Sequence, residues 1–393
     1  MSNSKVLLIH RAYRNRGGED AFLDDILKPA LSVAGLEYET LLLPPLGGMS
    51  SMAANLLEIF GMFFGFEGLR PSFRTCLGVL ERGGFSHVLF NNCLPTVSLK
   101  VFSAARSRGL RTFMWVHNFR LDCANGLHFD GKNICHQCLN AGSRWSFFQN
   151  CQRSWIQSFI YAFTYRGRRV ARSVVPFIDH FICNSEFTRG SLRGALGRMG
   201  LECSSSVISM PIPLAVDDIG AGTGSSRVAS LVSRLPQPFY LFLGRVSYDK
   251  GADIFLDFAR RFPERGFVMC GEGPMLEEIR SASADDRVAN FALAGVVNLE
   301  EKRWLFKNCE ALIVASRSPE TSSLVISESQ SYGTPVVYPR GGGAEETFKL
   351  LGRNGCALDE FVGQKFVRGS SGARALSLED FASSLKSGLT EFR

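Results

Sequence analysis

Two cationic side chains lie in a short loop that follows an apolar segment. Arg245 and Lys250 stand between Gly244 and Gly251, directly after Phe239–Leu243. Glycine after a strand lets backbone amides approach a phosphate closely. Arginine can bind phosphate oxygens through its planar fork, and lysine adds a compact charge. The loop therefore predicts a site for a phosphorylated ligand, with two solvated surface cations as the ordinary alternative.

Two carboxylates follow this loop in the sequence. Glu320 and Glu328 are eight positions apart, and helical spacing begins between them at Leu324, directly after Ser323. One carboxylate can accept both hydroxyls of a ribose, and a helix N-terminus can meet a diphosphate. Taken alone, such glutamates are usually solvated. The ordered set of cations, helix start and carboxylates predicts a site for a nucleotide diphosphate linked to a sugar, with one carboxylate on the ribose and the other beside the sugar.

Glycine pairs after other apolar segments add weaker signals. Gly271 and Gly273 follow the segment that ends at Cys270, and loops at strand ends line clefts in α/β domains. Gly341–Gly343 precedes a helix-like stretch and offers a second phosphate or sugar contact.

Short apolar segments alternate with helix-like stretches along the chain, which predicts an α/β fold with parallel sheets covered on both faces. We expect two doubly wound, Rossmann-like domains that face each other across a cleft. Their expected bounds are an acceptor-side domain at 1–205, a linker at 206–238, a donor-binding domain at 239–375 and a C-terminal helix at 376–393. The expected strands are Val6–Ile9, Tyr38–Leu43, His87–Asn91, Thr112–Val116, Phe181–Cys183, Tyr240–Leu243, Phe267–Cys270, Asn290–Leu293, Ala311–Ala315 and Pro335–Tyr338.

Composition narrows the class of protein. The 393 residues are 45% hydrophobic with a net charge of +7, and lysine and arginine form no nucleic-acid-binding tail. No apolar run approaches the roughly 18 residues of a spanning helix, and no signal peptide is recognised at the N-terminus. Eleven scattered cysteines indicate reduced thiols. These features predict a cytoplasmic protein, either free or peripheral at the cytoplasmic face of a membrane, with no nucleic acid as partner.

The ordered motifs over roughly residues 236–350 resemble the donor half of the family-4 glycosyltransferases, which have the GT-B fold. The resemblance implies that Arg245 and Lys250 contact the donor diphosphate, that Glu328 holds the ribose and that Glu320 lies beside the transferred sugar. It also implies retention at the anomeric carbon and a role in bacterial polysaccharide or glycolipid biosynthesis. Relatives often carry Pro-Phe-Gly where this chain has Thr321–Ser323, so the resemblance implies a donor class and not a particular donor.

The N-terminal half resembles the same family more loosely. Gly18 lies in a Gly-Gly loop after the first strand, which in such enzymes is near the donor phosphate; a plain turn is the alternative. His117 follows the strand Thr112–Val116, and the resemblance implies contact with the transferred sugar or the acceptor; a structural histidine is the alternative. Ser185 follows another strand and is expected to cap a helix.

Four cysteines cluster in the stretch after His117. Cys135 and Cys138 have the spacing of metal ligands, and Cys123 and Cys151 could complete a structural zinc site. The expected reaction needs no cofactor and no divalent metal, because no Asp-x-Asp occurs and the cations of the loop could neutralise the diphosphate.

A basic and aromatic stretch follows the cysteines. Residues 144–172 contain six arginines and no acid, and Trp155, Phe159 and Phe163 recur on one helical face. One interpretation is a helix that docks on anionic lipid, with Ile59–Phe66 as a second contact or an acceptor groove; the other is an aromatic core face.

These features predict an enzyme, a glycosyltransferase that moves a sugar from a nucleotide diphosphate to a hydroxyl of a carbohydrate or lipid-linked acceptor. Three alternatives stay open: a nucleotide-sugar epimerase or hydrolase with the same fold, a non-catalytic protein that binds the nucleotide sugar, and a nucleic-acid binder, which would explain only the arginine stretch.

Overall fold

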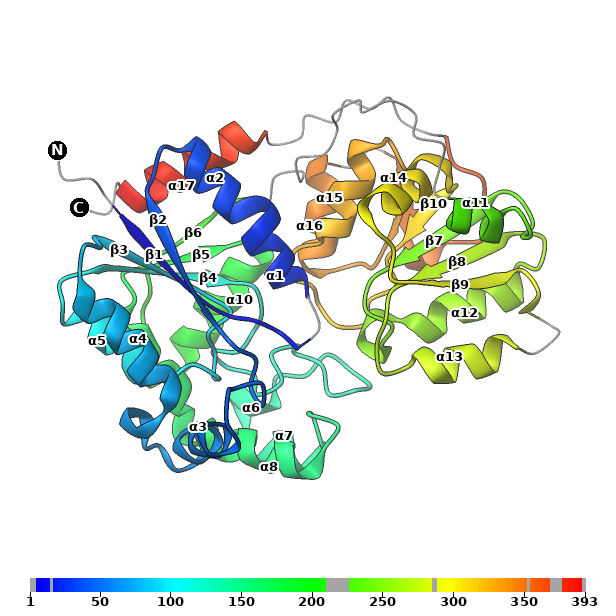
Figure 1. The fold of residues 1–393 in the computed structure, drawn as a ribbon. Helices are drawn as coiled ribbons and strands as arrows, with labels where there is room; N and C mark the ends of the chain where they lie inside the picture. Colours follow the sequence, from blue (N-terminus) through cyan, green and yellow to red (C-terminus); the bar gives the residue numbers. More distant parts are fainter. Residues whose placement is uncertain are drawn as a thin grey trace. The chain divides into compact units, whose positions relative to one another are not determined.

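A computed structural model describes residues 5–14, 17–209, 226–284, 288–351, 354–367 and 377–390. The chain divides into two compact units (Figure 1). The N-terminal unit comprises residues 1–130, 135–211 and 376–393, and the C-terminal unit comprises residues 131–134 and 212–375.

The N-terminal unit is built on a parallel six-stranded sheet. Its order is β2-β1-β3-β4-β5-β6, and all six residues of β1 are buried. Such complete burial is typical of a strand whose two faces are both covered. The strands are β1 (Val6–Arg11), β2 (Tyr38–Leu43), β3 (His87–Asn91), β4 (Arg111–Val116), β5 (His180–Cys183) and β6 (Ser205–Val207).

Helices of the N-terminal unit follow the strands, and a late segment of the chain joins them. Helix α17 packs on α2, and Lys386 Nζ donates a 2.9 Å hydrogen bond to the carbonyl of Ala34. The expected cap of α10 is confirmed, because Ser185 Oγ accepts the backbone N–H of Thr188 at 3.1 Å. The helices are α1 (Gly18–Phe22), α2 (Lys28–Val33), α3 (Met52–Phe64), α4 (Pro71–Arg82), α5 (Lys100–Arg106), α6 (Gln137–Asn140), α7 (Arg144–Phe148), α8 (Trp155–Thr164), α9 (Arg169–Val174), α10 (Glu186–Arg198) and α17 (Leu378–Thr390).

The C-terminal unit contains a second parallel six-stranded sheet, in the order β12-β11-β10-β7-β8-β9. Alternate residues of β7 enter different core clusters, Tyr240 and Phe242 on one face and Phe239 and Leu241 on the other. Helices therefore cover both faces. The strands are β7 (Phe239–Leu243), β8 (Gly266–Cys270), β9 (Phe291–Gly295), β10 (Ala311–Ile313), β11 (Val336–Tyr338) and β12 (Gly355–Ala357); the helices are α11 (Ser226–Val232), α12 (Ala252–Arg261), α13 (Leu276–Ser283), α14 (Leu299–Asn308), α15 (Leu324–Ser331) and α16 (Gly342–Leu351).

Helix α11 lies within the segment that the composition indicated as a linker. Val228 and Val232 of this helix are buried in the same core cluster as Phe239. The helix is therefore part of the C-terminal unit, and residues 210–225 of the expected linker lie outside the described residues.

The strand order of each sheet changes direction at one point, the topological switch point. In the C-terminal sheet the chain runs from β7 outward to β8 and β9, and then returns to β10 on the other side of β7. In the N-terminal sheet β2 and β3 likewise lie on opposite sides of β1. Ligands of doubly wound sheets bind beyond the carboxyl ends of the strands at such switch points. In the C-terminal unit this rule predicts a ligand site at the loops after β7 and β10.

Candidate functional site

The loops after β7, β8 and β10 approach one another through glycines. A Cβ on Gly251, whose φ is +71°, would lie 2.0 Å from the carbonyl oxygen of Ala315 after β10. A Cβ on Gly271, whose φ is +131°, would lie 1.9 Å from the carbonyl oxygen of Gly244 after β7. Gly273 is equally constrained, at 2.3 Å from the carbonyl oxygen of Val246. Contact between backbones explains these glycines without any ligand and fixes the loops as one rigid set.

Each of the two predicted cations is paired with a carboxylate. Lys250 Nζ donates to Glu320 Oε1 at 2.7 Å, which joins the loop after β7 to the loop after β10. Arg245 Nη2 donates to Asp249 Oδ2 at 2.7 Å, and the arginine side chain remains 53% exposed. Burial alone would raise the pKa of Asp249, but the charges of Arg245 and Lys250 and its hydrogen bonds lower it. An ionised Asp249 thus orients Arg245, a role that the sequence analysis did not assign.

Glu320 is held from three directions. Its carboxylate accepts Lys250 and the hydroxyl of Ser316, and its carbonyl accepts the N–H of Gly343 at 2.7 Å. A Cβ on Gly343 would lie 2.1 Å from the carbonyl oxygen of Thr321, so the start of α16 packs directly on this segment. The carboxylate of Glu320 is therefore a rigid part of the switch point, and Ser316 is a partner that sequence reasoning missed.

Helix α15 carries the other predicted contacts. Ser323 precedes Leu324, the first residue of the helix, and is buried, yet its hydroxyl has no hydrogen-bond partner among the described residues. A buried hydroxyl without a partner is costly unless a ligand or water satisfies it. Further along the helix, Glu328 Oε1 accepts Lys302 Nζ of α14 at 2.7 Å. Of the predicted donor residues, the structure thus joins Lys250 directly to Glu320, while Glu328 has its own lysine partner.

The N-terminal unit places a polar chain at its switch point. Asp20 accepts the N–H of Gly17 through Oδ2 at 2.8 Å, and its Oδ1 lies 2.8 Å from His10 Nε2. His10 Nδ1 lies 2.8 Å from Asn91 Nδ2, and the side-chain oxygen Oδ1 of Asn91 contacts His117 Nε2. The side-chain nitrogen of Asn91 can only donate, so Nδ1 of His10 accepts this hydrogen bond, and His10 carries its proton on Nε2 and donates it to Asp20. Gly18 itself is exposed, with open space where a Cβ would lie.

The same chain continues from His117 to the neighbouring strand. Asn184 Nδ2 lies 3.4 Å from His117 Nδ1, and the indole N–H of Trp115 donates to the Asn184 oxygen. The ring of His117 also stacks beside Trp115, with centroids 5.9 Å apart. Burial lowers the pKa of His117 to about 3, so the imidazole is neutral at physiological pH. Both ring nitrogens have protein partners, and the sugar contact expected of His117 stays a prediction.

Protonation of His117 should destabilise the fold in acid. Its folded pKa of about 3 lies below the ordinary 6.5, so its stability contribution is complete above pH 6.5 and is lost as the pH falls. The loss should be roughly 3 kcal/mol between about pH 7 and pH 4. In urea unfolding, the free energy of unfolding of His117→Gln should fall less steeply with acid than that of the native chain. His180 is another histidine whose pKa is lowered by burial, and His180→Gln measures its separate contribution. Equal acid dependence of His117→Gln and the native chain would contradict this prediction.

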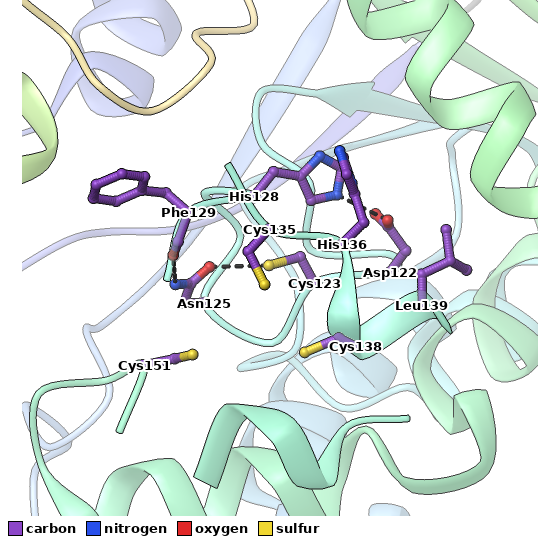
Figure 2. Close-up of a pocket in the computed structure, with 10 residues that line it drawn as sticks. All are labelled: Asp122, Cys123, Asn125, His128, Phe129, Cys135, His136, Cys138, Leu139 and Cys151. Carbon is purple, nitrogen blue, oxygen red and sulfur yellow. Dashed lines mark hydrogen bonds and ion pairs between the residues drawn. The ribbon is translucent and has the colours of Figure 1, made fainter. Parts of the chain in front are cut away.

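The four clustered cysteines line one small pocket, together with Asp122, His128 and His136 (Figure 2). A hydrogen bond between the thiols lowers the pKa of Cys138 and raises that of Cys123. Within the described residues, however, no group of three or more histidine, cysteine, aspartate or glutamate side chains is arranged to hold a metal ion. The donor set has suitable chemistry without a suitable arrangement, so zinc stays a prediction that metal analysis of purified protein checks.

Most of the C-terminal unit is similar to known glycosyl transferases. Residues 228–369 match a family described as glycosyl transferases group 1. Relatives include O-antigen chain mannosyltransferase C of Escherichia coli, 28% identical over 127 residues, which are 32% of this chain and 34% of that protein. Glycogen synthase of Thermus caldophilus is 26% identical over 178 residues, 44% of this chain and 40% of that protein. The match over residues 228–369 confirms that this part of the chain resembles glycosyl transferases, although the matched segments span well under half the length of these relatives.

Solved structures extend the likeness to both units. Anabaena HepE, in complex with UDP and glucose, has a TM-score of 0.56 at 17% identity, and the match covers 99% of this chain and 97% of that one. Sucrose-phosphate synthase of Thermosynechococcus elongatus has a TM-score of 0.60 at 15% identity, with coverage of 98% and 94%. The predicted fold class, α/β with two doubly wound parallel sheets of the GT-B type, is confirmed. Among the helices that the structure describes, none is long and apolar enough to cross a membrane.

Proposed function

We propose that the chain transfers a sugar from a nucleotide diphosphate to a hydroxyl of a carbohydrate or lipid-linked acceptor, with retention at the anomeric carbon. The observation that carries this proposal is the Lys250–Glu320 pair across the switch point of the C-terminal sheet, with Arg245 exposed beside it. A diphosphate that binds at the switch point would meet two cations, Arg245 and Lys250, on the same loop after β7.

The chemistry follows from these charges. When the bond between the anomeric carbon and the diphosphate oxygen breaks, its electron pair stays with the diphosphate. Arg245 has five N–H donors and uses one on Asp249, so others can bind phosphate oxygens. Lys250 supplies a second cation, which Glu320 holds in place. Because both charges are fixed before the reaction, they stabilise the departing diphosphate more than the ground state. No divalent ion is needed in this scheme.

The rest of the site recognises the donor. Glu328 presents a carboxylate that suits the two hydroxyls of a ribose, with Lys302 orienting it. The unpartnered hydroxyl of Ser323 and the first amides of α15 from Leu324 onward offer donors to a phosphate. Glu320 is assigned to the transferred sugar. In the N-terminal unit, Gly18 is assigned to the phosphate and His117 to the sugar, on the strength of the resemblance.

Named relatives support the donor class. HepE holds UDP and glucose, and the Escherichia coli relative acts on O-antigen chains. A role in bacterial polysaccharide biosynthesis is consistent with both. Eleven free cysteines favour a reducing compartment, so we place the reaction in the cytoplasm.

A thermal-shift panel of nucleoside diphosphates and their sugars tests this proposal. One nucleotide should stabilise the chain by about 2.7 kcal/mol at a hundredfold excess over its Kd, and Arg245→Ala should abolish most of that shift. Its sugar conjugate should then yield product only with an acceptor. Sugar release or isomerisation without acceptor would favour a hydrolase or epimerase, and binding without turnover would favour a non-catalytic protein. A panel without any stabilising nucleotide would overturn the proposal.

A further inference from the structure

Helices α3 and α8 expose an unusual number of large apolar side chains. Ile156 of α8 is 75% exposed and Leu56 of α3 is 61% exposed. Isolated apolar side chains are normal at a protein surface, but a contiguous group of them indicates a binding surface. The exposed side chains, called the apolar face below, are Leu56, Leu57, Phe60 and Phe64 of α3 and Trp155, Ile156 and Phe159 of α8.

The two helices lie side by side, so these side chains belong to one surface. Phe63 of α3 stacks on Phe163 of α8 with ring centroids 4.2 Å apart, and its ring lies 5.5 Å from that of Phe159. The rings of Phe60 and Phe64 are also in contact, with centroids 4.5 Å apart. Aromatic contacts thus run from one helix to the other. Phe163 is partly buried, whereas Trp155 and Phe159 are exposed, so these three side chains do not form a buried core face.

Arginines are the exposed charged side chains of the two segments that form this surface. Arg166 is exposed at the C-terminal end of both helices, where it donates to the carbonyls of Phe63 at 3.2 Å and Phe163 at 2.9 Å. Arg153 is exposed just before α8. In α3 and residues 144–172 the one acidic residue is Glu58, which is fully buried. The exposed charge of these segments is therefore positive.

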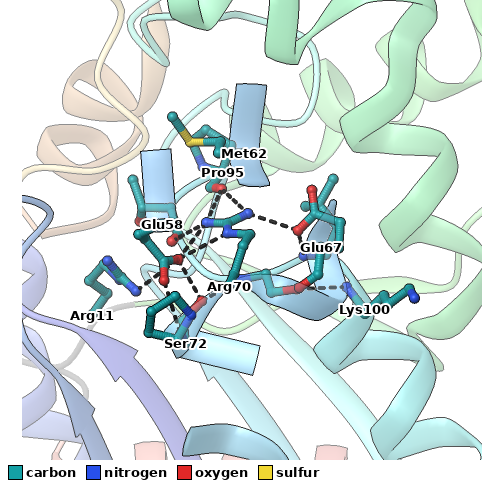
Figure 3. A network of polar contacts seen from close by, with 12 residues as sticks. Arg11, Glu58, Met62, Glu67, Arg70, Ser72, Pro95 and Lys100 are labelled. Atoms are coloured by element: carbon teal, nitrogen blue, oxygen red, sulfur yellow. Dashed lines mark hydrogen bonds and ion pairs between the residues drawn. The ribbon is translucent and has the colours of Figure 1, made fainter. Parts of the chain in front are cut away.

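A buried ion network makes the face rigid (Figure 3). Glu58, on the inner side of α3, accepts Arg70 Nε at 2.9 Å and the N–H of Ser72 at 2.9 Å. Arg70 also donates to Glu67 at 2.8 Å, and Arg169 donates to the carbonyl of Met62 near the end of α3 at 2.9 Å. These bonds hold the Glu58 side of α3 toward the protein interior. The apolar side chains of the helix therefore remain on its exposed side.

We propose that the apolar face, with Arg153 and Arg166, docks on the surface of an anionic lipid bilayer. Aromatic and leucine side chains enter the boundary between head groups and acyl chains, and arginines pair with anionic head groups. A protein partner of ordinary composition carries charges of both signs and does not require a surface whose exposed charges are all positive. An anionic membrane favours such a surface. This docking does not depend on donor binding in the C-terminal unit. It rests on the proposed function in one respect: a lipid-linked acceptor would be held in the same membrane.

Vesicle flotation of the full chain tests this inference. Phosphatidylcholine vesicles with about 30% phosphatidylglycerol should carry the protein, and pure phosphatidylcholine should carry much less. Each arginine near an anionic surface contributes about fivefold to binding, so Arg153→Gln with Arg166→Gln should weaken it roughly 30-fold. Phe60→Ser with Ile156→Ser should weaken it at least about tenfold. Leu350→Ser, at an exposed leucine of the C-terminal unit, is the matched control and should bind normally.

Three results would overturn the inference. Equal flotation with neutral and anionic vesicles would exclude the charge selection. Unchanged flotation of the Phe60→Ser, Ile156→Ser variant would exclude this face. A concentration-dependent dimer in sedimentation analysis that this variant abolishes would show that a second copy of the chain covers the face. Thermal shifts with the nucleotide, measured on the same variants, separate these failures from failure of the proposed function.

Discussion

Replacing Lys250 by methionine should lower kcat by about 10²- to 10³-fold, the usual cost of removing one donor that stabilises a developing anion. The ammonium lies 2.7 Å from Glu320 at the switch point, and methionine keeps much of its length and apolar stem. The loss should appear more strongly in kcat than in KM, because the charge that Lys250 meets grows as the diphosphate leaves. Initial rates at several donor concentrations measure both constants.

Two companion variants separate charge from fold. Lys250→Arg retains the cation and should recover part of the rate. Lys349→Met removes an exposed lysine of α16, whose partner is Glu345 in the same helix, and should leave the rate unchanged. A Lys250→Met enzyme with native kcat and KM would remove the lysine from the mechanism, whereas equal losses in Lys349→Met would reveal a general charge effect.

Replacing Arg70 by methionine should destabilise the N-terminal unit by about 3–5 kcal/mol, the usual cost of breaking a buried ion pair from one side. Arg70 is completely buried and bonds Glu58, Glu67 and the carbonyls of Pro95 and Thr96. Without it, the buried carboxylates of Glu58 and Glu67 each lose one guanidinium partner, and among the described residues only Arg11 and Arg169 remain to pair with them. Urea unfolding followed by circular dichroism measures the change in free energy.

An exposed ion pair in the same unit provides the control. Arg82 pairs with Glu39 at 2.7 Å, and its side chain is 61% exposed. Arg82→Met should cost under about 1 kcal/mol, because exposed pairs contribute little. Similar losses for the two variants would mean that burial does not set the value of the Arg70 network. A combined Arg70→Met, Glu58→Gln variant should be less damaged than the sum of its parts.

The sequence was most informative where burial on both faces leaves an unbroken apolar segment. Strands such as β3 and β7 were found at or within one residue of their bounds for that reason. The edge strands β6 and β12 were missed, because each has three residues and little apolar character. Helix α11 was also missed, since the glycines and prolines before it dominated the composition of the segment.

The sequence could not show which side chains, distant from one another along the chain, meet in the site. The motif order predicts Lys250 and Glu320 in one site, and the structure brings their side chains to 2.7 Å, while their contacts with a donor stay a prediction. Neither Asp249 nor Ser316 carried a signal of its own, because a single carboxylate or hydroxyl in a loop is common. The chain from Asp20 through His10 and Asn91 to His117 joins three strand ends, and only the parallel register of β1, β3 and β4 brings these residues together.

A crystal structure of the full chain with the nucleoside diphosphate that stabilises it most is the most direct measurement of where the donor binds. We expect the diphosphate oxygens at about 3 Å from Arg245 and Lys250, and the ribose hydroxyls on the carboxylate of Glu328. A nucleotide bound elsewhere, with Lys250 still joined to Glu320 and no phosphate beside either cation, would contradict the proposed donor site.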